Sequence, residues 1–151
     1  MVRIKNYTIV PIVINDDDIQ TFIVKTEPVP KGRPRFIRST GRTYTPPETR
    51  EATKILSENI SLRKRGTIPK MVGAIRYGVA VYCKFYCKRP KNMKEGAAVL
   101  KNTRPDIDNY MKLVLDACND AEVWEDDSMV VELHGQKWYC ASYQQPQVQI
   151  Q

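Results

Sequence analysis

The sequence contains no apolar run close to the roughly 20 residues that a helix needs to cross a membrane, which argues against a membrane protein. Its first 18 residues include an apolar patch, but Pro11 interrupts this patch and three aspartates close it. No small-residue cleavage signature follows, so we expect mature protein rather than an export signal. The expected location is therefore the cytoplasm.

Histidine and paired cysteines, the usual ligands of zinc, are also scarce. There is one histidine, His134, and the four cysteines form no CxxC motif. Cys83 and Cys87 stand four residues apart in a strand-like stretch, a spacing that argues against a zinc site. We expect these two residues, Cys118 and Cys140 to be reduced and mostly buried thiols.

Acidic residues are missing from much of the chain. The formal charge is +7, the pI is about 9.3, and no Asp or Glu occurs from residue 28 to residue 47. Nine of the 17 acidic residues instead fall between residues 105 and 132, where Lys112 is the only Lys or Arg. Net charge attracts anions without specifying an activity. An acidic island in a basic chain is nevertheless what a metal-dependent enzyme acting on a polyanion needs, and nucleic acid is the expected polyanion.

The 151 residues predict a single α+β domain spanning residues 1–151, with a mixed sheet and two main helices. β-branched and aromatic residues favour strands at residues 7–14, 20–26, 74–87 and 129–143, the first of them an extra strand at the N-terminus. Pro, Gly and cations favour loops at residues 27–49 and 88–103, and residues 144–151 predict a ragged tail.

A first helix is predicted from Thr45, its expected cap, to about Arg63. It would bury four apolar side chains at helical spacing, namely Ala52, Ile55, Leu56 and Ile60. A second helix is predicted to begin at Asn109 or Tyr110. Its apolar stripe would consist of Tyr110, Leu113, Val114 and Ala117.

The acidic island begins with Asp106 and Asp108. Pro105 favours an extended backbone before it, so we expect both carboxylates at a strand end and on the same side of the chain. Asp108 would also cap the second helix. Lys112 and Asp116 follow Asp108 at intervals of four residues, which places all three on one polar face.

Carboxylates held side by side repel each other unless a cation lies between them. Mg²⁺ accepts one or two carboxylates and keeps several waters, which leaves positions for phosphate oxygens. Such an ion can deliver a hydroxide and neutralise charge during phosphodiester cleavage. Asp126 and Asp127, after a tight turn, would complete the site, and Lys112 would stabilise the developing charge or orient the attacking water.

A simpler interpretation stays open for each of these residues taken alone. Asp106 and Asp108 would then be a helix cap and a solvated turn acid. Residues 125–127 would form a hairpin turn, and Lys112 would belong to a solvated face. The joint arrangement, with basic segments on both flanks, favours the metal site.

Residues 104–130 resemble the signature of the RusA-type Holliday junction resolvases, small endodeoxyribonucleases of phages and prophages. The signature combines Asp-x-Asp-Asn, a lysine, Asp-Ala and a later Asp-Asp. The matching residues are Asp106, Asp108, Asn109, Lys112, Asp116, Ala117, Asp126 and Asp127. Residues 28–35 and 44–46 also resemble the N-terminal part of many members, so the resemblance covers about residues 22–138. The usual Asn-Gly after Asp-Ala is replaced by residues 118–120, which puts the helix exit in doubt but leaves no catalytic position empty.

This resemblance implies a RusA-like fold and a Mg²⁺-dependent homodimer that makes paired nicks in strands of like polarity at a four-way DNA junction. It implies recombination or repair as the setting, in a bacterial host cell. Asp106, Asp108 and Asp127 would hold the metal, and Lys112 would assist catalysis. Asp126 is a weaker candidate, which would lie next to the metal ligands without binding the ion itself. Whether Mn²⁺ replaces Mg²⁺ stays open.

The basic segments predict the DNA-binding surface. Lys31, Arg33 and Arg35 alternate with Gly, Pro and Phe, a pattern suited to phosphate contacts. Residues 88–101 form a second candidate surface with a weaker claim. Arg104 would meet the scissile phosphate or pair with Asp106.

Two other nuclease chemistries are disfavoured. No acid in residues 116–132 is followed two positions later by lysine, as the restriction-type PD…(D/E)xK motif requires. His134 lies in a strand pattern and is expected to be structural. A non-catalytic DNA-binding protein and a nuclease of other branched DNA remain as alternatives.

Overall fold

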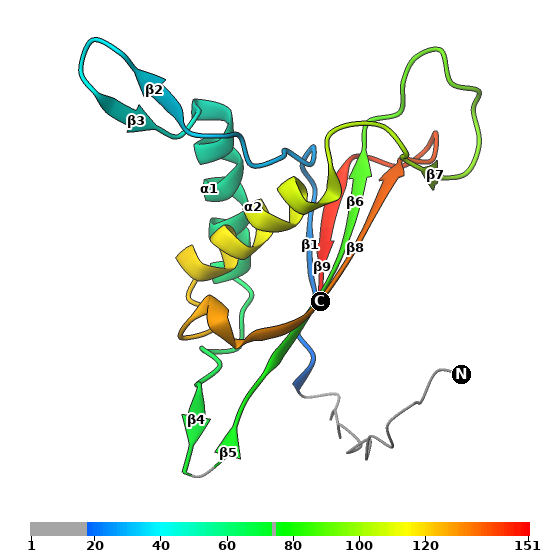
Figure 1. The fold of residues 1–151 in the computed structure, drawn as a ribbon. Coiled ribbons are helices and arrows are strands. Elements are labelled where there is room, and N and C mark those ends of the chain that lie inside the picture. Colours follow the sequence, from blue (N-terminus) through cyan, green and yellow to red (C-terminus); the bar gives the residue numbers. More distant parts are fainter. Residues whose placement is uncertain (1–17, 74) are drawn as a thin grey trace, which may run out of the picture.

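The computed structural model describes residues 18–73 and 75–151, so the strand predicted at residues 7–14 lies outside it (Figure 1). The described part has an α+β architecture with a mixed sheet, as predicted. Two helices, α1 (Pro47–Ser61) and α2 (Ile107–Asp120), pack on one face of this sheet (Figure 1). No helix among the described residues is both long and apolar enough to span a membrane.

The main sheet has the strand order β1-β9-β6-β8-β7. These strands are β1 (Phe22–Val24), β9 (Gln147–Ile150), β6 (Val79–Cys87), β8 (Val130–Tyr139) and β7 (Val99–Leu100). β6 and β8 pair in parallel, whereas the other neighbours are antiparallel. β7 covers only the last two residues of β8, so most of the outer edge of β8 is unpaired in the described chain.

The prediction of a ragged tail was wrong, because β9 lies inside the sheet. Ile150 pairs with Phe22 of β1 and with Cys83 of β6. Val148 and Ile150 are 2% and 3% exposed and face the core. The intervening glutamines are only half-buried, so the polar side of this short strand concealed its apolar side.

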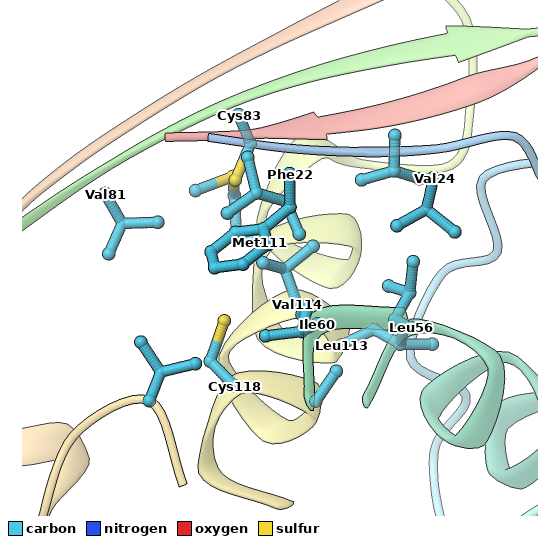
Figure 2. Close-up of a cluster of buried hydrophobic side chains, with 14 of the residues drawn as sticks. Phe22, Val24, Leu56, Ile60, Val81, Cys83, Met111, Leu113, Val114 and Cys118 are labelled. Atoms are coloured by element: carbon cyan, nitrogen blue, oxygen red, sulfur yellow. The ribbon is translucent and has the colours of Figure 1, made fainter. Parts of the chain in front are cut away.

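The core fills the space between the sheet and the two helices (Figure 2). The predicted stripe of α2 is confirmed, since Tyr110, Leu113, Val114 and Ala117 are all buried. In α1, Leu56 and Ile60 are buried, and Ala52 and Ile55 pack against the core from a half-buried position. The predicted Thr45 cap was wrong, because Pro46 occupies the N-cap and no side chain caps the helix.

The four cysteines are free and buried, as expected. Burial raises the pKa of the Cys118 thiol to about 12 and also raises that of Cys83. A buried thiol with a raised pKa has little thiolate, so both side chains act as packing groups rather than nucleophiles.

Two small hairpins project from the body (Figure 1). One pairs β4 (Met71–Val72) with β5 (Ile75–Arg76). The other pairs β2 (Arg35–Ile37) with β3 (Arg42–Tyr44), within the segment predicted to be a loop. All six residues of β2 and β3 are exposed. We call residues 33–44 the basic arm.

Candidate active site

Asp106 occupies the N-cap of α2, with an extended backbone at φ −70° and ψ 147°. Its carboxylate makes no capping hydrogen bond and is exposed. The helix starts at Ile107, so Asp108 lies in its first turn. The expectations of a shared strand end and of an Asp108 cap were therefore both wrong. Because the Asp106 carboxylate does not bind the backbone N–H groups of the helix, it remains available for a ligand.

Asp108 and Lys112 form an ion pair one helical turn apart. Lys112 Nζ donates to Asp108 Oδ2 at 2.8 Å, and both side chains are more than half exposed. The Lys112 ammonium lowers the pKa of the Asp108 carboxyl. The predicted polar face is thus confirmed for this pair, and it keeps Asp108 ionised at the start of the helix.

The backbone that leads into Asp106 is held by a buried ammonium. Lys101 is 9% exposed. Its Nζ donates to Thr103 Oγ1 and to the Arg104 carbonyl, both at 2.5 Å. The same ammonium lies 5.0 Å from the centroid of the Tyr139 ring, where a cation–π contact adds to these bonds.

Lys137 holds the same segment from strand β8. Its Nζ donates to the carbonyls of Thr103 at 2.8 Å and Pro105 at 2.7 Å. Two ammonium groups therefore fix three consecutive carbonyls immediately before Asp106. We call Lys101 and Lys137 the lysine clamp. Sequence reasoning missed it, because a lysine that binds backbone carbonyls looks no different in a sequence from a solvated one.

At the other end of α2, the acids of residues 125–127 divide into two kinds. Glu125 accepts from the Lys70 N–H at 2.9 Å. Asp126 caps the short 3₁₀ helix η2 (Asp127–Met129) by accepting from the Ser128 N–H at 2.7 Å, and this bonding lowers the pKa of its carboxyl. Both carboxylates thus accept from backbone N–H groups, whereas the exposed Asp127 carboxylate accepts only a long side-chain hydrogen bond in the described structure.

Asp127 lies beside Asn119, near the C-terminal end of α2. Asn119 Nδ2 is 3.4 Å from Asp127 Oδ2, and Asn119 Oδ1 accepts from the buried Trp124 indole at 2.6 Å. Asn119 belongs to the segment where the chain departs from the RusA signature, and sequence reasoning gave it no role. The chain turns away from the end of α2 at Glu122, whose φ of 52° is in the left-handed region.

The structure does not bring Asp127 to the other two acids within one chain. Residues 106 and 119 lie at opposite ends of α2, about 20 Å apart at 1.5 Å of rise per residue. Ligands of one Mg²⁺ must each lie about 2 Å from the ion. Accordingly, no three His, Cys, Asp or Glu side chains in the described part of the chain are grouped as a metal site. Asp106 and Asp108 nevertheless fit Mg²⁺ as donors, being exposed oxygen ligands of a hard cation.

The predicted DNA-binding cations differ in what they contact. Lys31 is already engaged, because its Nζ lies 2.6 Å from Asp116 Oδ2. Arg33 and Arg35 are exposed, and no ion pair among the described residues involves them. Arg104 is exposed as well and does not pair with Asp106 in the described structure. Of the two roles considered for Arg104, pairing with the acid is therefore not observed.

His134 is held on the sheet rather than near the acids of α2. Its Nε2 lies 2.8 Å from Glu132 Oε1, and its ring stacks on Tyr82 with 4.6 Å between centroids. This arrangement agrees with the expected structural role.

A surface cleft of about 500 Å³ lies between α1 and the C-terminal half of α2. Hydroxyls of Thr49, Thr53 and Ser57 line one side, and Asp116 and Asn119 line the other. The cleft does not include Asp106 or Asp108. It is therefore separate from the N-terminal end of α2.

Comparison with known proteins gave two findings. The family model described as "Endodeoxyribonuclease RusA" matches residues 25–151. The chain is also similar to "Uncharacterized protein YqaN" of Bacillus subtilis (strain 168), with 31% identity over 140 residues, which are 88% of this chain and 94% of that protein. The family match extends past the predicted limit at residue 138 and includes β9.

Proposed function

Because this chain belongs to the RusA family of endodeoxyribonucleases, we propose that it is a Mg²⁺-dependent nuclease that resolves Holliday junctions by paired symmetric nicks. The observation that carries the proposal is the N-terminal end of α2. There the exposed carboxylate of Asp106 makes no capping hydrogen bond, and Asp108, two residues later, is kept ionised by Lys112. The lysine clamp fixes the backbone that presents both acids.

Each residue has a distinct role in the proposed reaction. Asp106 and Asp108 supply oxygen ligands to Mg²⁺, and Mn²⁺ can be tested in its place. When bound there, a divalent ion would supply an activated water and neutralise charge on the phosphate. Lys112 stands one turn along the helix, where its ammonium can stabilise charge that develops on the phosphate. Arg104 has a guanidinium free of carboxylates within the described chain and can bind the scissile phosphate.

The position of Asp127 supports a homodimer as the active unit. If Asp127 is the third metal ligand, it must come from a second copy, because about 20 Å of helix separates it from Asp106 in its own chain. Mixing Asp108→Asn chains with Asp127→Asn chains tests this sharing. If the site is shared between chains, each mixed dimer keeps one intact site and should nick one strand of the junction. If each site is built within one chain, both sites of the mixed dimer are defective and the mixture should stay inactive.

The first experiment is cleavage of a labelled four-way junction by wild type and Asp108→Asn, with Mg²⁺, with Mn²⁺ and with chelator. Asp120→Asn is the matched control, since Asp120 is an exposed acid at the other end of the same helix. We expect paired nicks that require metal and Asp108 but not Asp120, with junction binding retained by Asp108→Asn. Tight binding without nicking under any divalent metal would favour a non-catalytic DNA-binding protein. Equal cleavage of flaps and forks would favour a nuclease of other branched DNA.

A further inference from the structure

The basic arm has a feature that phosphate binding does not explain. Its β2 and β3 strands pair Arg35 with Tyr44, Phe36 with Thr43 and Ile37 with Arg42. Phe36 is 62% exposed, although a phenylalanine in a paired strand usually packs on a neighbour. An aromatic ring left in water on a projecting hairpin indicates a partner that covers it.

The two faces of the arm differ in character. Residues paired across an antiparallel ladder lie on the same face. Arg35 and Arg42 therefore share one face with Ile37 and Tyr44, while Phe36 and Thr43 stand on the other. The arm thus presents an aromatic ring on the face opposite its two strand arginines.

The arm is fastened at its root to the helix that carries the acids. The Lys31 N–H donates to the Asn109 carbonyl at 2.8 Å, and the Lys31 ammonium pairs with Asp116. The Gly32 N–H donates to Thr49 Oγ1 at 3.0 Å. A Cβ at Gly32 would lie 3.0 Å from that same oxygen, so this close approach favours glycine. The root of the arm is therefore tied to α2 through Lys31 and to α1 through Gly32.

The charge of the arm selects DNA as its occupant. It carries Arg33, Arg35, Arg38 and Arg42 and no acid. Proteins that bend DNA insert apolar wedges such as Phe or Leu between base steps while cations hold the backbone. Unstacking is least costly where pairing or stacking is already interrupted. The branch point of a junction is such a place.

We propose that Phe36 is a wedge that inserts at the branch point of DNA while the arginines of the arm hold the adjoining backbones. This inference rests on the proposed function, since it takes branched DNA as the substrate. It adds how the branch would be recognised. A chain that lost the wedge would still bind duplex through its cations, but it would prefer junctions less.

The test uses a junction that carries 2-aminopurine, a fluorescent base that brightens when unstacked. The base is placed at the branch point and, in a separate junction, inside one of the four DNA duplexes. Binding is measured with chelator, so that no strand is cut. For wild type we expect brightening at the branch point only. For Phe36→Ala we expect this signal to be lost and junction affinity to fall about tenfold, the scale of one lost base–aromatic contact, with duplex affinity unchanged.

Two variants control the result. Phe36→Leu keeps an apolar wedge and should retain most of the signal. Leu62→Ala removes another exposed apolar side chain, 85% exposed at the end of α1, and should change nothing. Full brightening with Phe36→Ala would overturn the proposed wedge. A loss of dimer by Phe36→Ala in sedimentation would also overturn it, because the ring would then belong to a contact between copies of the chain.

If wild type cleaves junctions and Phe36→Ala still unstacks them, this inference fails alone. If wild type cuts no DNA, the proposed function fails first.

Discussion

In the basic arm, the arginines extend from a hairpin and pair with no carboxylate of the described chain. In residues 88–103, two of the cations turn inward. The Arg89 guanidinium donates to the carbonyls of Lys94, Ala97 and Cys140, all within 2.9 Å, and Lys101 belongs to the lysine clamp. Both segments looked like basic loops in the sequence.

The difference follows from how each segment satisfies its backbone. Buried or crowded carbonyls need donors. Pairing of β2 with β3 supplies these donors in the arm, so its arginines are left for an outside partner. Most of residues 88–103 has no strand partner, and Arg89 and Lys101 instead donate to carbonyls in this segment and to that of Arg104. Positive charge therefore indicates a DNA surface only where the backbone does not need the cation.

The largest effect is expected when Lys101 of the lysine clamp is replaced. Lys101→Met keeps an unbranched side chain of nearly the same length but leaves the Arg104 carbonyl without its charged donor, so the free energy of unfolding should fall by about 3 kcal/mol. Urea unfolding measures this. Lys91→Met, an exposed lysine of the same segment, should stay within about 0.5 kcal/mol of wild type. Equal stability of the two variants would remove the distinction between inward and outward cations.

The arm should respond in the opposite way. Changing Arg35 and Arg42 together to Gln should weaken DNA binding about tenfold or more and reduce the salt slope of log K by about 2, because two phosphate contacts are lost. The melting temperature should not change. Arg89→Gln is the converse control, with lower stability and an unchanged salt slope. A salt slope that drops only for Arg89→Gln would reverse the two assignments.

A smaller effect should appear in the titration of Tyr139. The Thr103 hydroxyl and the Lys101 ammonium hold the pKa of this phenol below its ordinary 10.0. Because the folded pKa is lowered, the stabilisation is present above the unfolded pKa and is lost as pH falls through the folded pKa. Lys101→Met should raise the pKa of Tyr139, as measured by NMR of ring-labelled tyrosine with Tyr139→Phe for assignment. An unchanged pKa would mean that the ammonium does not act on the ring.

The smallest effect is expected for the outward lysines of residues 88–103. Lys91 and Lys94 are exposed, and changing both to Gln should alter junction affinity by less than about twofold at constant salt slope. Filter binding across a salt series is sufficient. If the slope falls by about 2, this segment is a second DNA surface after all, and the contrast with the arm is limited to Arg89 and Lys101.

The sequence predicted those parts of the fold that depend on local periodicity. The stripe of α2 was readable because four apolar residues recur at helical spacing. β9 was not, because Val148 and Ile150 alone carry its pattern and the neighbouring strands supply the rest. The arm hairpin was missed because Pro, Gly and cations favour a loop, while its turn depends on Gly41 at a φ of 67°.

For the candidate site, the sequence indicated chemistry but not distance. The spacing of Asp108 and Lys112 is a property of one helix, so their contact could be predicted. The position of Asp127 depends on the turn through Glu122 and on Asn119, which no spacing rule gives. The metal-binding and DNA-binding roles of these residues stay predictions until nicking and binding are measured.

The place of β9 in the sheet also affects the order of synthesis. The residues of β1 are synthesised early, but the neighbour of β1 in the sheet is β9, near the end of the described chain. Phe22 and Val24 therefore have no strand beside them until residues 147–150 leave the ribosome. Pairing between such distant segments is slow, because a long loop must close first. A nascent chain of this protein would carry its acidic helix and its basic arm well before the sheet that supports them is complete.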